Sequence, residues 1–85
     1  MNHHATPTFW KAYEALPSKT QRLADRSFKL MKTDPSHPSL HFKPVGRFWS
    51  SRVGLRTRAL AVRQGDDCIW FWIGTHADYD KLLER

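Results

Sequence analysis

In the first third of the chain, apolar residues recur every three or four positions, the spacing of an amphipathic helix. A first helix is predicted between Thr6-Pro7, a favourable capping pair, and Pro17, which ends it. A second helix runs from Ser18, whose spacing to Gln21 is that of a capping box, to a point just before Pro35. The pattern predicts an αα-hairpin whose apolar side carries Phe9, Tyr13, Leu16, Ala24, Phe28 and Met31.

After a loop at residues 34–39, the apolar period changes to two, which is typical of β-strands. Four strands are predicted, at residues 40–43, 48–53, 57–63 and 68–73, and their short connections favour antiparallel pairing. The last strand is apolar on both faces, so we expect it at the centre of the sheet, with Trp70 in the core. The segment HADYDKLLER, in which Asp78 and Asp80 favour a helix start, predicts a short terminal helix.

These elements together predict an α+β fold. The N-terminal αα-hairpin packs on one face of a small antiparallel sheet of about four strands, and a short helix ends the chain. No repeat, low-complexity segment or linker divides the sequence, so residues 1–85 are expected to form a single domain. Because two helices cover only one face, the other face is expected to stay partly open. Strand alternation places Ser50 with Arg52 on one face, and Arg58 with Leu60 and Val62 on one face of the next strand.

The charge changes this picture through its placement. The chain carries 14 Lys and Arg against 8 Asp and Glu, a net charge of +6. Residues 35–65 contain no acidic residue, and the remainder of the chain has no net charge. Concentrated positive charge on strands favours binding of a polyanion over a merely solvated surface. The cations of this acid-free segment are Lys43, Arg47, Arg52, Arg56, Arg58 and Arg63.

Several classes of protein are disfavoured. No apolar run is long enough to span a bilayer, and the N-terminus lacks the pattern of a secretory signal. The single cysteine, Cys68, permits no internal disulfide, which fits a cytosolic location. Its place within an apolar strand predicts a buried side chain and not a nucleophile. Pro38 between His37 and His41 argues against a helical metal site, and neither a metal nor a cofactor is predicted. The pair His3-His4 is given no role.

The ordered segments DPSHPSLHFKPVG, WSSRVGLRTRALAVR and IWFWIGTHADYDKLL resemble the RelE/ParE superfamily of bacterial type II toxins. The resemblance extends from Phe9 to Leu83. Its most specific part is Arg-Val-Gly at Arg52, followed by Arg58 and by a strand that ends in Gly-Thr-His. It implies a small cytosolic toxin held inactive by a cognate antitoxin protein. It further implies contact with operator DNA only through that antitoxin, and no membrane partner.

The RelE-like branch cleaves messenger RNA, usually in the ribosomal A site, and the resemblance assigns residues to that reaction. Arg58 matches the arginine that stabilises the phosphate, a task that suits a bidentate guanidinium. His76 matches a position just after the last strand where some RelE-like toxins carry a histidine or an arginine, and a histidine there can serve as acid or base. The alternative is that His76 caps the helix or is simply exposed at the surface. Tyr79 either stacks on a base, completes a proton relay or packs the terminal helix. His41 is the second candidate for a base. Phosphate or RNA contacts are expected from Arg52, Lys43, Arg47 and Arg56.

The sequence therefore predicts a ribosome-dependent messenger RNA endonuclease that works by metal-independent acid/base chemistry. Two alternatives stay open. One is a ParE-like inhibitor of DNA gyrase with no nuclease activity, which needs neither His76 nor a convergent Arg58. The other is a degenerate member that only binds its antitoxin or DNA.

Overall fold

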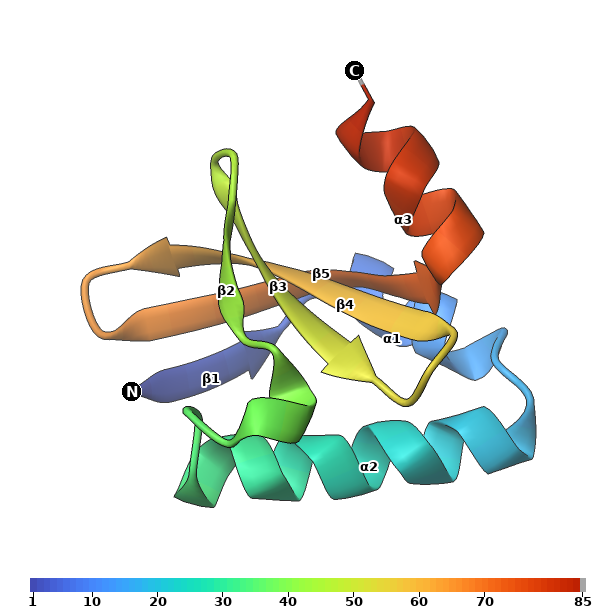
Figure 1. Cartoon of the computed structure of the whole chain (residues 1–85), viewed down its shortest axis with the longest axis horizontal. Coiled ribbons are helices and arrows are strands. Elements are labelled where there is room, and N and C mark those ends of the chain that lie inside the picture. Colours follow the sequence, from blue (N-terminus) through green and yellow to red (C-terminus); the bar gives the residue numbers. More distant parts are fainter. Residues whose placement is uncertain (85) are drawn as a thin grey trace.

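The computed structural model describes residues 1–84, and within them three helices flank a five-stranded sheet of order β1-β5-β4-β3-β2 (Figure 1). Along the chain the elements are β1 (Asn2–Ala5), α1 (Pro7–Glu14), α2 (Ser18–Thr33), the 3-10 turn η1 (Pro38–Leu40), β2 (Lys43–Val45), β3 (Phe48–Val53), β4 (Thr57–Gln64), β5 (Asp67–Thr75) and α3 (His76–Leu83). None of these helices is long and apolar enough to cross a membrane.

The α+β class is confirmed, whereas the four-stranded, wholly antiparallel sheet is wrong. Residues Asn2–Ala5 form a fifth strand, which pairs in parallel with β5 and makes β5 an inner strand. Its sequence, NHHA, lacks the alternation of apolar and polar residues that would predict a strand. The strand is held by backbone pairing and by its histidines: Trp70 Nε1 donates to His3 Nδ1 at 3.1 Å, and His4 Nε2 lies 3.3 Å from Asp67 Oδ1. The pair left without a role therefore anchors an edge of the sheet.

The helix boundaries agree with the predicted ones, although one of the two predicted caps is absent. Thr6 caps α1 as expected, and its hydroxyl accepts from the Phe9 N–H at 3.1 Å. The capping box at the start of α2 is wrong, because Pro17 occupies the cap position and no side chain caps this helix. Gln21 reaches back instead, and its amide donates to the carbonyl oxygens of Tyr13 and Leu16, which ties α2 to the end of α1.

The predicted strand at residues 40–43 is wrong as well. Leu40 closes the η1 turn and is 1% exposed, and His41 follows it in the left-handed region with φ 45°. The edge strand β2 begins only at Lys43 and includes Pro44, which an edge strand tolerates because one side of its backbone needs no partner. Burial of Leu40 thus overrides the local alternation of apolar residues.

The core lies between the sheet and the helices α1 and α2. Ala24 and Met31 of α2 pack with Val53, Ala59 and other small or apolar residues of the sheet. Trp70 is buried there, as predicted, and the same helix-covered face borders an apolar groove of about 310 Å³. Cys68 is also buried, and desolvation raises the pKa of its thiol to about 11, so it is an inert apolar group at neutral pH.

The second face of the sheet is open. In Figure 1, the tip of the β2–β3 hairpin and helix α3 both rise on the side of the sheet opposite α2. A register shift between Leu60 and Ala61 turns both Phe71 and Trp72 to this open face, where Phe71 packs against Phe48. The chain then enters α3 at once, and the His76 N–H donates to the Arg56 carbonyl at 2.7 Å, which fixes α3 to the β3–β4 turn.

Candidate functional site

Strand register brings the two arginines of the Arg-Val-Gly motif region together. Arg52 of β3 and Arg58 of β4 are direct cross-strand partners, so their side chains share the open face. The next residue in this row is Gly74 of β5, which pairs with Arg58. Gly74 is needed for space and does not turn the chain: a Cβ there would lie 2.5 Å from Cζ2 of Trp72.

A small polar pocket of about 130 Å³ opens on this face beside the paired arginines. Strands β2, β3 and β4 supply its floor, the residue after η1 supplies one side, and the first turn of α3 supplies the other. All four predicted catalytic residues and two of the four predicted phosphate-binding residues meet here. The pocket is lined by His41, Lys43, Ser50, Arg52, Arg58, His76 and Tyr79.

The electrostatics of the pocket are dominated by unpaired cations. Arg58 donates from Nη1 to the Thr57 carbonyl at 3.0 Å, and Arg52 donates from Nε to the Gly54 carbonyl at 3.3 Å. Within residues 1–84 neither guanidinium is paired with a carboxylate. Burial lowers the pKa of Arg58, and the charge of Arg52 lowers it further, although a guanidinium stays protonated at neutral pH. Two facing cations without a counterion form a strong site for an anion.

His41 joins the pocket from the loop before β2. Its φ of 45° makes it the one non-glycine residue with a positive φ among those described, and such strain is concentrated at functional sites. Its side chain is exposed, and its Nε2 lies 3.4 Å from Nη1 of Arg52. Because a guanidinium only donates, this long contact engages the lone pair of Nε2.

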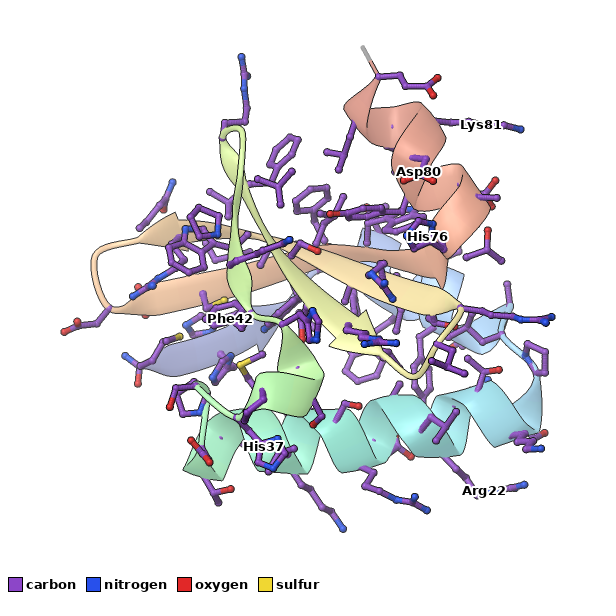
Figure 2. The ribbon with its side chains drawn as sticks, viewed as in Figure 1. Arg22, His37, Phe42, His76, Asp80 and Lys81 are labelled. Atoms are coloured by element: carbon purple, nitrogen blue, oxygen red, sulfur yellow. The ribbon has the colours of Figure 1, made fainter. Side chains whose placement is uncertain are left out.

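His76 and Tyr79 reach the pocket from α3. Thr75 caps this helix by accepting from the Asp78 N–H, which sets the first turn against the end of β5. The two rings lie 5.7 Å apart between centroids. Tyr79 is 8% exposed, a burial that supports the packing role among its three alternatives. His76 is exposed at the rim of the pocket, and its Nδ1 lies 3.1 Å from Oδ2 of Asp80 (Figure 2).

The other two predicted phosphate-binding residues lie outside the pocket. Arg47 is exposed in the tight turn between β2 and β3, and Arg56 is exposed in the turn between β3 and β4. Their expected contacts with phosphate or RNA therefore stay a prediction that the pocket does not include.

Two residues at or beside the pocket, Ser50 and Asp80, were not predicted from the sequence as part of the site. Ser50 is 2% exposed and lines the pocket, and its place on the same face as Arg52 was readable from strand alternation. Asp80 was read only as a helix-starting acid, although its spacing of four from His76 on one helix is a signal of contact. Among residues 1–84, no three His, Cys, Asp or Glu side chains gather as metal ligands do.

Comparison with known proteins shows the fold. No protein-family model and no curated protein sequence matches the chain. Among solved structures, it is similar to YafQ from E. coli strain BL21(DE3), with a TM-score of 0.73 and 10% identity over 92% of this chain and 96% of that one. It is similar to a chain of the RelB–RelE antitoxin–toxin complex from Methanococcus jannaschii, with a TM-score of 0.73 and 16% identity over 93% and 96%.

A third similar structure is the YoeB/ParE toxin from Agrobacterium tumefaciens, with a TM-score of 0.67 and 16% identity over 89% of this chain and 99% of that one. The resemblance stated from the sequence is thus confirmed at the level of the fold, which is that of the RelE/ParE toxins. These neighbours include both RelE-like and ParE-like names, so the fold does not choose between the two activities.

Proposed function

We propose that this chain is the toxin of a toxin–antitoxin pair and that it cleaves messenger RNA bound to the ribosome. The observation that carries the proposal is the polar pocket, in which two unpaired arginines, a lysine and two histidines converge. A gyrase-directed toxin has no need of proton-transferring side chains beside a phosphate site. That the message is cut on the ribosome rests on the resemblance to the RelE-like branch, and it would place the protein in the cytoplasm.

The donor set of the pocket fits RNA cleavage without a metal. Three cationic side chains repel a metal ion and attract a phosphate, and no carboxylate from residues 1–84 lines the pocket. Arg58 and Arg52 would hold the phosphate and stabilise the charge that grows on it in the transition state, with Lys43 beside them. His76 stands at the rim, where it can exchange a proton with the attacking or the leaving oxygen.

The reaction balances without any co-reactant. The ribose 2′-hydroxyl loses its proton and its oxygen bonds to phosphorus, while the bond from phosphorus to the 5′-oxygen of the next nucleotide breaks. That 5′-oxygen takes up a proton. The products are a 2′,3′-cyclic phosphate and a free 5′-hydroxyl, so the ends of the fragments report the chemistry.

A cognate antitoxin is the proposed partner. Two of the similar structures are RelE–RelB complexes, from Methanococcus jannaschii and Pyrococcus horikoshii. The pocket on the open face presents Lys43, Arg52 and Arg58 of the acid-free segment, so an acidic segment that folds on binding would complement it. Contact with operator DNA would then come through the antitoxin.

The test compares two assays on the same protein, with Arg58→Ala as the matched inactive variant. In cell-free translation, we expect wild-type protein to stop synthesis and to cut the message to 2′,3′-cyclic phosphate ends. A 2′-O-methyl group at the cut position should block cleavage, because the nucleophile is then missing. Arg58→Ala should leave the message intact.

The second assay follows supercoiling by DNA gyrase. Trapped or linearised DNA with intact messages would overturn the proposal in favour of the gyrase-directed alternative. If the protein affects neither messages nor DNA supercoiling, the proposal is overturned in favour of a chain that only binds its antitoxin.

A further inference from the structure

Two consecutive residues of β3 are buried serines, and they lie on opposite faces of the sheet. Ser50 is 2% exposed and Ser51 is 3% exposed. On the core face, the Ser51 hydroxyl donates to the Leu40 carbonyl at 3.4 Å. On the open face, Ser50 lines the polar pocket, and its hydroxyl forms no hydrogen bond within residues 1–84. The fold therefore provides a partner for one serine and none for the other, although their burial is almost the same.

The free hydroxyl of Ser50 opens into the pocket. Within residues 1–84, no fully enclosed side-chain nitrogen or oxygen lacks a hydrogen-bond partner. Because Oγ of Ser50 has no partner, this oxygen is not fully enclosed. Since Ser50 is otherwise covered and lines the pocket, the part of Oγ that stays accessible belongs to the pocket wall. A molecule bound in the pocket can thus reach this oxygen.

The neighbours of Ser50 on the open face provide no acceptor for its proton. Strand β3 lies between β2 and β4 (Figure 1), so Ser50 pairs with Lys43 on one side and with Leu60 on the other. The next side chain along β3 on the same face is that of Arg52. Lysine and arginine side chains only donate hydrogen bonds, and a leucine side chain makes none. The hydroxyl thus lies beside two cations that attract an anion, and an anion would bring the acceptor that the hydroxyl lacks.

We infer that Ser50 is a substrate-binding residue whose hydroxyl donates a hydrogen bond to a non-bridging oxygen of the phosphate held by Arg52 and Arg58. The inference rests on the proposed function and deepens it by adding a neutral donor at the floor of the pocket. A largely covered hydroxyl without a protein partner lowers the stability of the free chain, and a phosphate oxygen removes this penalty when it binds. Because the side chain is already packed in the sheet, little conformational entropy is lost on binding. Ser50 keeps its proton, so the balance of the cleavage reaction is unchanged.

The first test distinguishes a binding role from a structural one and needs no ligand. Ser51→Ala is the matched control, because it makes the same change in the next residue at almost the same burial. We expect the urea midpoint of Ser50→Ala to be at least as high as that of the wild type, since no hydrogen bond within the protein is lost. Ser51→Ala should lower the midpoint, because the Leu40 carbonyl loses its donor. A clear loss of stability in Ser50→Ala would show that this hydroxyl serves the fold and would overturn the inference.

The second test measures the binding of inorganic phosphate to the full chain by NMR titration at constant ionic strength. We expect Ser50→Ala to raise the Kd for phosphate roughly 10–100-fold, the usual effect of losing a hydrogen bond to a charged group. Ser50→Thr keeps the hydroxyl and should restore most of the affinity, and Ser51→Ala should bind phosphate as the wild type does. An unchanged Kd in Ser50→Ala, or a wild-type pocket that binds no phosphate, would contradict the inference.

Cleavage of a message on the ribosome separates the failure of this inference from the failure of the proposed function. Ser50→Ala should lower kcat/KM by a similar factor, roughly 10–100-fold, and Ser51→Ala should cleave at the wild-type rate. If phosphate binding depends on Ser50 but the chain cuts no message, Ser50 still completes a phosphate site and only the proposed function falls. If Ser50→Ala cuts messages as fast as the wild type, the proposed function stands and the inference is overturned.

Discussion

The two faces of the sheet are built from the same strands but carry opposite chemistry. The face under α1 and α2 holds the core and an apolar groove of about 310 Å³, where Trp70 and Ile73 are buried. The open face holds a polar pocket of about 130 Å³ with the facing pair Arg52 and Arg58. Alternation along a strand sends successive side chains to the two faces, so one short strand stabilises the fold and forms the site at once. Residues of the core on one face and residues of the pocket on the other should therefore differ in whether their replacement costs stability or activity.

The largest effect should follow from the core face. Trp70→Ala removes an indole that is 6% exposed, packs beside Phe42 and donates a hydrogen bond to His3. We expect the free energy of unfolding to fall by about 3–5 kcal/mol, a large part of the stability of so small a domain. Trp72→Ala, on the same strand but on the open face and only half-buried, is the matched control and should cost less. Urea unfolding measures both, and equal losses would contradict the comparison.

Replacing an arginine of the pocket on the open face should reduce activity and leave stability unchanged. Arg58→Ala removes a preorganised charge, so we expect the cleavage rate to fall roughly 10²–10³-fold while the urea midpoint stays close to that of the wild type. Arg63→Ala is the control, because Arg63 belongs to the same strand but lies over the ring of Trp49, 4.5 Å from its centroid, outside the pocket. Single-turnover cleavage measures both. Should Arg63→Ala lose as much activity, the effect would be one of bulk charge and the pocket would be wrongly assigned.

This separation was only partly predictable from the sequence. The strand Phe48–Val53, the turn after it and the terminal helix were predicted from the sequence pattern. The strand and the turn agree with the structure, and the helix spans His76–Leu83 of the predicted segment, whose last residue, Arg85, lies outside the described residues. The pairing of Arg52 with Arg58 was not readable, because register depends on the geometry of the Gly54–Arg56 turn and not on the side chains alone. That these side chains converge in one pocket could therefore be established only from the structure.

The errors have local physical causes. The strand Asn2–Ala5 lacks apolar alternation and gains its stability from a partner more than 60 residues away, which no window of sequence contains. Trp70 and Trp72 are two residues apart and should share a face, but the register shift beside Leu60 separates them. Asp80 was visible in principle, since a spacing of four on a predicted helix indicates a contact.

An intermediate effect is expected at Gly74, where one substitution should reduce both the stability of the fold and the rate of cleavage. An added Cβ would lie 2.5 Å from the ring of Trp72 and beside the cross-strand partner Arg58. Gly74→Ala should therefore lower the free energy of unfolding by about 1–3 kcal/mol and also slow cleavage, because the displaced indole crowds the pocket. Urea unfolding and single-turnover cleavage on the same preparation give the two numbers.

The control for Gly74 is Gly46→Ala, in the turn between β2 and β3. Gly46 has φ +60° and nothing within 4 Å of an added Cβ, so the change should cost roughly 1–2 kcal/mol of backbone strain without touching the pocket. Cleavage by Gly46→Ala should stay at the wild-type rate. A Gly74→Ala protein that is destabilised but cleaves normally would show that Trp72 moves away from the site.

The smallest effect concerns His3, the histidine of the core face, whose environment favours its neutral form. Burial lowers the pKa of His3 from its usual 6.5, helped by the positive N-terminus, Lys32 and His4, and its Nδ1 accepts from Trp70. A lowered folded-state pKa means that the unfolded chain binds the proton more readily. The stability that neutral His3 contributes is therefore complete above pH 6.5 and is lost as the pH falls through the lowered pKa. Between pH 7.5 and pH 5.5, the urea midpoint of the wild type should fall further than that of His3→Gln. The glutamine keeps a hydrogen-bond acceptor for Trp70 but does not titrate. An equal fall of the urea midpoint in both proteins would contradict the prediction. The acid sensitivity of the stability would then come from other histidines and not from His3 in β1.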